Sequence, residues 1–249
     1  GGTCLNVGCI PSKALLDTSH HFSFLKNESK QHGINTAGVS IDVRRMIQRK
    51  RGVVQRLTLG VAGLFKKNKV EWLKGHGTLR GEGRIEVRPV GDEAGENYTV
   101  AARHIIIATG SVPMRIPPAQ VDNELIADST GALAFTDVPR RLGIIGAGVI
   151  GLELGSVWKR LGAEVTILEA LDDFLPAVDR QIAAAAEKVL RKQGLDIKLG
   201  ARVTGSGSNN REVTVTYEDS SGKQQLVVAY LFYYFCETIN NCASKILST

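Results

Sequence analysis

The spacing of apolar and polar residues predicts a chain in which helices and strands alternate. Between residues 43 and 67, apolar side chains recur every three or four positions, which is typical of an amphipathic helix. Another helix is expected from Ala14 to about Leu25. Further on, the apolar runs that predict strands alternate with helical stretches, in the order strand 142–145, helix 149–161, strand 164–168, helix 179–193 and strand 196–199. This alternation favours a parallel sheet.

Shorter elements are expected around this core. Gly-rich turns separate three strand-like runs at 70–73, 84–87 and 98–100. The run from Arg103 to Ala108 contains consecutive isoleucines and ends at Thr109-Gly110-Ser111, which predicts a buried strand that meets a sharp turn. Segments 213–217 and 225–229 favour an antiparallel hairpin. The expected fold class is therefore α/β, with Rossmann-like parallel sheets and small antiparallel β-meanders.

Prolines mark the expected domain boundary. Pro113, Pro117 and Pro118 fall within 112–118, a composition typical of a linker. We therefore expect one domain at 1–115, a second at 116–228 and a divergent tail at 229–249, where the sequence changes character. The chain starts at Gly1, without Met and inside a Gly-rich motif, so we expect a piece of a longer protein.

The distribution of charge and the length of the apolar runs argue against two classes of partner, nucleic acids and membranes. The formal net charge is +6, and the densest basic run lies between apolar residues at helical spacing, with Arg44, Arg45, Arg49, Lys50 and Arg51. Such a run is more typical of a solvated helix face than of a nucleic-acid site. The longest apolar run, 226–236, is shorter than the roughly 20 residues of a membrane-spanning helix. We expect neither a nucleic-acid nor a membrane partner.

A Gly-rich turn follows the strand expected at 142–145 and opens the helix at 149. The turn reads Gly146-Ala147-Gly148-Val149-Ile150-Gly151. The first glycine permits a tight turn, the second lets the backbone approach a pyrophosphate, and the third lets helix and strand pack closely. The helix N-terminus offers N–H groups to phosphates. The alternative is a tight turn without a ligand.

Glu169 ends the next expected strand and bears on the choice of cofactor. Its carboxylate can accept hydrogen bonds from ribose hydroxyls and would repel a 2′-phosphate. Ala170 and Leu171 follow it, so no Arg is placed to bind such a phosphate. The pattern favours NAD over NADP, and the alternative is that Glu169 is a surface charge.

Two cysteines near the start, Cys4 and Cys9, are separated by a spacing that fits no zinc knuckle, and no metal site is expected. In a regular helix, residues five apart are about 7.5 Å apart along the axis and point roughly 140° apart. A disulfide needs Cα atoms within about 7 Å. A bond therefore requires distorted backbone, which Asn6, Gly8 and Pro11 can supply. The alternative is two buried thiols in a core helix.

The stretch from Gly1 to Leu16, GGTCLNVGCIPSKALL, resembles the redox-active disulfide signature of the pyridine nucleotide–disulfide oxidoreductases. Its IPSKA version is typical of dihydrolipoamide dehydrogenases. Glutathione reductases usually have a second Lys in place of Ser12, and the soluble transhydrogenases of the family lack the second cysteine. Segments 66–70, 108–111 and 143–162 also resemble this family. The resemblance extends to about Val228.

The resemblance implies FAD and NAD as cofactors. Cys4 and Cys9 would form a disulfide against the flavin, with Cys4 exchanging with dihydrolipoamide and Cys9 next to the ring. Lys13 would lie near the flavin and pair with Glu153, and such a cation lowers the pKa of a nearby thiol. The implied FAD contacts are Thr3, Lys13, Gly77, Thr109, Gly110 and Ser111.

The NAD site and the partners are implied in the same way. The NAD site would include the turn and the helix start, namely Gly146, Ala147, Gly148, Val149, Ile150, Gly151, Leu152 and Glu153, together with Glu169 and Val203. Electrons would pass from dihydrolipoamide to the disulfide, then to FAD and NAD. The implied partners are lipoyl domains of 2-oxoacid dehydrogenase or glycine cleavage complexes, and a second copy in a full-length homodimer. The implied compartment is the mitochondrial matrix or, alternatively, the bacterial cytoplasm.

Other family segments are not found in this chain, including the first FAD motif and the interface domain with its catalytic His. We therefore expect the chain alone to bind FAD poorly and to lack full turnover. Two alternatives stay open. One is a non-catalytic NAD-binding remnant at 116–228, and the other is a related NAD-linked flavin enzyme such as a mercuric reductase.

Overall fold

The computed structural model describes residues 2–91, 95–113, 116–122, 125–209, 212–228, 230–233 and 236–237. Its centre is a five-stranded sheet in which every neighbouring pair is parallel. The strand order is β5 (Ile126–Asp128), β12 (Tyr230–Tyr233), β6 (Arg141–Ile145), β7 (Glu164–Leu168) and β8 (Asp196–Lys198). The α/β class expected from the sequence is confirmed.

Helices connect these strands, namely α4 (Ser129–Ala132), α5 (Val149–Leu161) and α6 (Arg180–Lys192). The apolar periodicity predicts α5 and α6, whereas α4 was not expected. The apolar face of α5 includes Trp158, which is fully buried in the same core as Ile144 and Ile167. Gly155 allows close packing, because a Cβ there would lie 3.0 Å from the Ile144 side chain. Helix α5 is thus packed closely against β6 at Gly155.

Strand β12 lies within the segment expected to be a divergent tail. It pairs with β6 on one side, Tyr230 opposite Leu142, and with β5 on the other. The Tyr230 ring also lies 5.1 Å from the Phe135 ring. The start of the expected tail is therefore part of the central sheet, although the domain boundaries themselves stay a prediction. Beyond it, β13 (Cys236–Glu237) pairs with β4 (Val112–Pro113), and residues 238–249 lie outside the described part.

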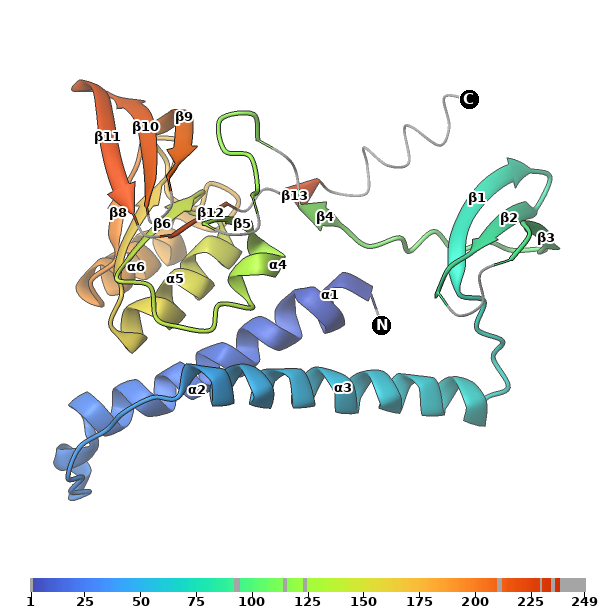
Figure 1. Ribbon diagram of the computed structural model, residues 1–249, viewed down its shortest axis with the longest axis horizontal. Coiled ribbons are helices and arrows are strands. Elements are labelled where there is room, and N and C mark those ends of the chain that lie inside the picture. Colours follow the sequence, from blue (N-terminus) through green and yellow to red (C-terminus); the bar gives the residue numbers. More distant parts are fainter. Residues whose placement is uncertain are drawn as a thin grey trace.

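An antiparallel sheet packs beside the central one, at the upper left of Figure 1. Its order is β11 (Gly222–Val228), β10 (Val213–Asp219) and β9 (Arg202–Ser208), which confirms the predicted hairpin. Val213 and Val215 are fully buried and form a core cluster with Ile145 and Leu168. This second cluster covers the ends of β6 and β7.

The first part of the chain is mainly helical, with α1 (Gly2–Val7), α2 (Cys9–Asn27), a 3-10 turn at Ser29–His32 and the long α3 (Val43–Lys67). Helix α2 packs against both α3 and α5. A small antiparallel sheet follows at the far end of α3, at the right of Figure 1. It consists of β1 (Gly75–Gly81), β2 (Arg84–Pro89) and β3 (Tyr98–Ala101).

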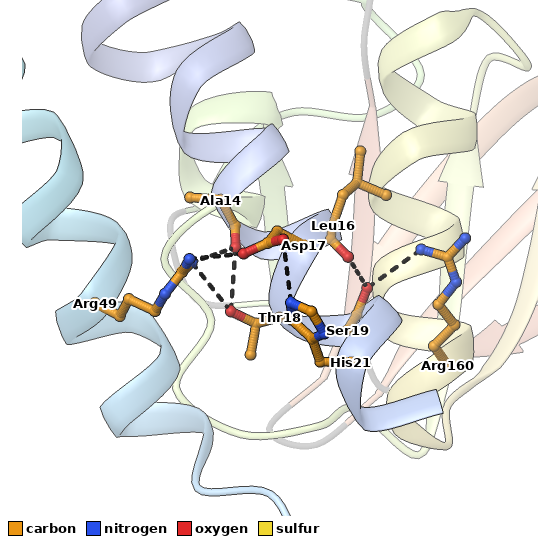
Figure 2. A network of polar contacts seen from close by, with 8 residues as sticks. All are labelled: Ala14, Leu16, Asp17, Thr18, Ser19, His21, Arg49 and Arg160. Atoms are coloured by element: carbon orange, nitrogen blue, oxygen red, sulfur yellow. Dashed lines mark hydrogen bonds and ion pairs between the residues drawn. The ribbon is translucent and has the colours of Figure 1, made fainter. Parts of the chain in front are cut away.

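Polar contacts fix α2 on both sides (Figure 2). From α3, the Arg49 guanidinium lies 2.6 Å from the Asp17 carboxylate and donates to the Ala14 carbonyl at 3.0 Å. From α5, Arg160 donates to the Ser19 hydroxyl at 3.4 Å. Helix α2 is therefore held between α3 and α5, the helix that connects β6 and β7.

Two expected strands are wrong. Residues 103–108 form no strand, and Ile106 is 92% exposed. An apolar run becomes a strand only where another strand offers backbone partners, and among the described residues no strand pairs with this one. Residues 70–73 are not a strand either, because the Val70 N–H donates to the Phe65 carbonyl and ends α3. The strand β1 begins at Gly75 instead.

Candidate functional site

A break at Gly8 brings the two cysteines together. Helix α1 ends at Val7 and α2 begins at Cys9, with Gly8 at φ −128° and ψ −117° between them. A Cβ at Gly8 would lie 3.0 Å from the Cys4 Cα and 3.1 Å from the Thr3 carbonyl oxygen, closer than side-chain carbons normally approach backbone. The predicted distortion is confirmed, and Gly8 is the residue that permits it.

Cys4 and Cys9 are free, exposed thiols on either side of this break. They are therefore not the buried thiols of a regular core helix, and that alternative is wrong. The disulfide that the resemblance implies is not formed in this dithiol structure, and it stays a proposal.

The pKa of the Cys9 thiol is raised above its ordinary value. The largest cause is the hydrogen bond to Cys4, followed by burial and by the charge of Cys4, while Lys13 acts in the opposite direction. The expected lowering by a neighbouring cation is thus outweighed. Part of the reason is geometric, because the Lys13 ammonium is 2.6 Å from the Glu153 carboxylate, which offsets its charge.

Glu153 joins the thiol helix to the helix of the Gly-rich turn. Its Oε1 lies 2.6 Å from the Lys13 Nζ, and its Oε2 lies 3.0 Å from the Ser12 Oγ. The Ser12 hydroxyl is also 3.1 Å from the carbonyl oxygen of Cys9. The Lys13–Glu153 pair implied by the resemblance is present, and Ser12 is a partner that the sequence did not reveal.

A cavity of about 230 Å³ lies over the thiols. Its walls come from α1, the start of α2, residues 111–113, α4 and the start of α5. Thr3 fixes one wall by donating to the Ser111 carbonyl at 3.0 Å. Gly110 has φ +80°, and a Cβ there would lie 2.8 Å from the Thr3 Oγ1. Thr3, Gly110 and Ser111 are therefore brought together at the thiols.

Gly77 is placed elsewhere. It lies on β1, in the small sheet beyond α3, and does not line the cavity (Figure 1). Thr109 directly precedes Gly110 and does not line the cavity either. The structure therefore brings Thr3, Lys13 and Ser111 to the cavity and Gly110 next to Thr3, whereas Gly77 lies in a separate sheet.

The Gly-rich turn has the geometry that its sequence predicts. Gly146 has φ +101°, and a Cβ at Gly151 would lie 2.3 Å from the Gly146 carbonyl oxygen. At Gly148, a Cβ would meet no atom within 4 Å. Gly148 precedes α5 and offers no capping side chain. The open face at Gly148 and the N-terminus of α5 therefore fit the pyrophosphate of a dinucleotide.

Glu169 lies at this turn. Its carboxylate accepts hydrogen bonds from the Ala147 N–H at 2.8 Å and from the Leu171 N–H at 3.0 Å. The Glu169 carbonyl accepts from the N–H of Ala201, so β9, which carries the partly buried Val203, begins beside it. Glu169 is thus held at the turn and is not a loose surface charge. The start of α5 also lines the thiol cavity, through Val149, Ile150 and Glu153. Leu152 does not line it.

The sequence missed two features of the cavity wall. Ser129, Thr130 and Leu133 line it from α4 and its C-cap. Behind them lies Lys50, which is only 8% exposed and donates to the Leu133 carbonyl at 2.7 Å, and burial lowers its pKa. Lys50 was expected on a solvated face. The sequence contained a sign of its burial, because its helical spacing from Val43, Met46 and Ile47 places it on the apolar face of α3.

None of the helices in the described part of the chain is both long and apolar enough to cross a membrane. No three of its His, Cys, Asp or Glu residues are grouped so that they could hold a metal ion.

Comparison with known proteins adds independent evidence. The family described as pyridine nucleotide-disulphide oxidoreductase matches residues 1–235, a range that includes β12. The dihydrolipoyl dehydrogenase of Cupriavidus necator is 50% identical over 225 residues, which cover 90% of this chain and 47% of that protein. The mitochondrial dihydrolipoyl dehydrogenase of Pisum sativum is 44% identical over 228 residues, 92% of this chain and 45% of that protein. The chain therefore spans about half the length of these relatives.

A solved structure agrees with this result. The HOCl-induced flavoprotein disulfide reductase RclA of Escherichia coli superposes with a TM-score of 0.74 at 30% identity, over 96% of this chain and 49% of that one. The family and this flavoprotein neighbour imply the use of FAD and NAD(P). With the thiol pair, the Gly-rich turn and the match over residues 1–235, this chain belongs to the pyridine nucleotide-disulphide oxidoreductase family.

Proposed function

We propose that the protein containing this chain oxidises protein-bound dihydrolipoamide to lipoamide and reduces NAD, with Cys4 and Cys9 alternating between dithiol and disulfide. One observation carries the proposal. The exposed thiol pair flanks the break at Gly8 in a cavity that also receives Glu153 from the dinucleotide helix. The relatives that are dihydrolipoyl dehydrogenases support this choice of reaction.

The proposed exchange starts from the Cys4–Cys9 disulfide. A thiolate of dihydrolipoamide attacks the Cys4 sulfur, the Cys4–Cys9 bond breaks, and Cys9 leaves as a thiolate. The second substrate thiol, deprotonated, then attacks the sulfur bonded to Cys4, which releases lipoamide and leaves Cys4 reduced. Two electrons pass from substrate to protein, and two protons leave the substrate thiols. Lys13, whose charge lowers the pKa of Cys9, stabilises the leaving thiolate.

FAD, when bound, would supply the two-electron connection between the dithiol and NAD. We propose that Thr3, Lys13, Thr109, Gly110 and Ser111 hold it, and that Gly77 contributes only from the separate small sheet. The described residues fit one wall of a flavin site, because the thiols, Lys13 and the Thr3–Ser111 contact share one cavity.

For NAD, the chain supplies the turn from Gly146 to Gly151 and the N-terminus of α5. We propose that Glu169 accepts hydrogen bonds from the ribose hydroxyls and that the site prefers NAD to NADP. Val203, at the start of β9, would complete this side. The open face at Gly148 supports a pyrophosphate at this position.

We further propose lipoyl domains of 2-oxoacid dehydrogenase or glycine cleavage complexes as partners, and a homodimer for the full-length protein. The relatives include a plant mitochondrial enzyme and a bacterial one. We propose the mitochondrial matrix as the compartment, with the bacterial cytoplasm as the alternative. The 249-residue chain by itself should bind FAD poorly and lack full turnover.

The thiol chemistry can be tested on the chain itself. The purified chain is oxidised, freed of oxidant and mixed with dihydrolipoamide or, at equal thiol concentration, with glutathione. Alkylation followed by peptide mass spectrometry then reports Cys4 and Cys9. We expect dihydrolipoamide to regenerate both thiols at concentrations where glutathione does not, and a Cys4→Ser variant to form no Cys4–Cys9 disulfide. Failure of the two cysteines to couple under oxidant would sink the proposal.

A second candidate is a non-catalytic NAD-binding remnant. The intact Gly-rich turn on a closed core favours it. NADH fluorescence separates the two, because the remnant predicts NADH binding together with thiols that do not couple. NADH binding together with a disulfide reducible by dihydrolipoamide favours the enzyme.

A further inference from the structure

The positive charge of the chain is concentrated in helix α3. This helix contains eight Lys or Arg residues and no Asp or Glu, whereas the whole chain has a formal net charge of +6. The residues outside α3 are therefore net negative. Of the eight cations only Lys50 is buried, and the other seven are exposed. A local concentration of exposed positive charge attracts negatively charged partners.

Three of the exposed arginines lie in one row along α3. Arg45, Arg49 and Arg56 follow one another at spacings of four and seven residues, which place them on the same side of a helix. They line a groove of about 520 Å³ between α3, α2 and the loop that precedes α3. The apolar side chains of Ile41 and Met46 also line this groove. Its lining therefore fits a ligand that has both anionic and apolar groups.

Two of these arginines have no carboxylate partner within the part of the chain that the structure describes. Arg49 is paired with Asp17 at 2.6 Å (Figure 2). Arg45 donates instead to the neutral Gln48 side chain at 3.2 Å, and Arg56 has no side-chain partner there. Like charges four residues apart destabilise a helix. Carboxylates of a bound ligand would relieve this repulsion.

One carboxylate of the chain itself lines the groove, and it has another role. Asp42 is the N-cap of α3, and its Oδ1 accepts a hydrogen bond from the Arg45 backbone N–H at 2.9 Å. The capping contact fixes this carboxylate at the start of the helix. It therefore lies more than two turns of helix before Arg56 and leaves that guanidinium to a ligand.

Gly52 lies in the same row, between Arg49 and Arg56, and lines the groove. A glycine inside a helix is less favourable than an alanine, so its presence calls for a reason. Packing within the chain gives none. A Cβ at this position would lie at an ordinary contact distance of 3.6 Å from the Arg56 Nη1 and would meet no other atom within 4 Å. The missing side chain instead keeps the groove open between the two guanidinium groups.

The kind of residue on this face favours an acidic protein over a nucleic acid. Arg binds a carboxylate through two parallel hydrogen bonds. No aromatic residue occurs at 43–64, so this part of α3 offers no ring on which a base could stack. We propose that the groove docks an acidic segment of a partner protein. Carboxylates of that segment pair with Arg45 and Arg56, and an apolar side chain packs against the apolar lining. This docking does not depend on which reaction the thiols perform.

The test measures how the purified chain binds a short fluorescein-labelled peptide of Glu and Leu, by fluorescence anisotropy at physiological ionic strength. We expect binding of this peptide and, for a matched peptide of Gln and Leu, a Kd at least about tenfold higher. Arg45→Ala/Arg56→Ala should raise the Kd of the Glu and Leu peptide about tenfold, because two exposed carboxylate pairs are lost.

Arg44→Ala/Arg51→Ala is the matched control. It removes the same charge from two exposed positions of the same helix that do not line the groove. Its Kd should change by less than about twofold, because salt screens exposed charges that do not touch the ligand.

A second pair of variants tests the shape of the groove without a change of charge. Gly52→Leu fills the groove and should raise the Kd at least about tenfold, because overpacking excludes the peptide. Gly60→Leu is its control, since Gly60 is an exposed residue of α3 outside the groove, where a Cβ would meet no atom within 4 Å. It should leave binding unchanged. Both substitutions favour the helix, so circular dichroism should show α3 intact in each.

Three results would overturn the proposal. The first is no binding of the Glu and Leu peptide by the parent chain. The second is an equal loss of binding in the two arginine pairs, which would show attraction by net charge without a site. The third is tighter binding of a single-stranded oligonucleotide of the same charge, which would make this face of α3 a nucleic-acid site. All three are independent of the thiols and of dihydrolipoamide.

Discussion

Two apolar runs of this chain, 103–108 and 141–145, have similar composition and opposite surroundings. In the second run, Leu142 and Ile144 are completely buried, with β12 on one side and β7 on the other. In the first, Ile106 is 92% exposed. Sequence alone predicts a buried strand for both. The difference shows that an apolar run becomes a strand only when neighbouring strands accept and donate its backbone hydrogen bonds.

The thiol-bearing helix α2 and the small β1–β3 sheet differ in the same way in how they contact the central sheet. The central sheet and α5 contribute most of one core, which includes Trp158 and Ile167. The thiol-bearing helix has its buried residues, such as Leu15, in that same core. The thiol pair is therefore positioned by the dinucleotide half through α2 and α5, whereas the small β1–β3 sheet lies apart from it (Figure 1).

The largest effect is expected from shortening one isoleucine in each run. Ile144→Ala should lower the free energy of unfolding by about 2–5 kcal/mol, because it leaves a cavity in a closed core. Ile106→Ala should change it by less than about 0.5 kcal/mol, because the side chain is in solvent. Urea unfolding of both variants measures the contrast. Similar losses in the two variants would show that the first run is buried in solution.

A smaller effect is expected at the Gly-rich turn, where stability and binding can be separated. Gly151→Ala places a Cβ 2.3 Å from the Gly146 carbonyl oxygen, and overpacking of this kind costs about 1–3 kcal/mol. Gly148→Ala meets nothing in the free protein, so its unfolding free energy should stay close to that of the parent. Both should weaken NADH binding, which fluorescence titration measures. Unchanged NADH affinity in Gly148→Ala would contradict a pyrophosphate at this position.

The sequence predicts the local features well and the long-range ones less well. Helix α5 has the predicted bounds, because Gly148 and Gly162 flank it as cap residues. The break at Gly8 was also expected from the cysteine spacing. The place of β12 between β6 and β5 was missed, because a parallel neighbour is set by a crossover far along the chain. Ser12 was missed as a contact because its partner Glu153 is 141 residues away.

The contact between α2 and α3 should show a still smaller effect. Arg49 lies 2.6 Å from Asp17, and both side chains are 48% exposed, so solvent screens the pair. Arg49→Ala should lower the free energy of unfolding by up to about 1 kcal/mol, and less at high salt. Arg44→Ala is the control, because the Arg44 side chain is exposed and has no ion pair or hydrogen bond within the part of the chain that the structure describes. Equal losses in both variants would exclude a specific contribution of the Asp17 contact.

The smallest effect concerns the proton of Cys9. Its pKa is raised in the folded protein, so its contribution to stability is present below the ordinary thiol pKa and is lost as the pH rises through the folded value. Because Cys9 is exposed, this contribution is small, and thiolate absorbance is a better measurement than unfolding. Cys4→Ala removes the main cause and should lower the pKa of Cys9. The titration of Cys9 is the difference between Cys4→Ala and Cys4→Ala/Cys9→Ala, which cancels the other cysteines. A pKa of Cys9 that stays raised without Cys4 would mean that the local surroundings of α2, and not the thiol–thiol contact, hold the proton.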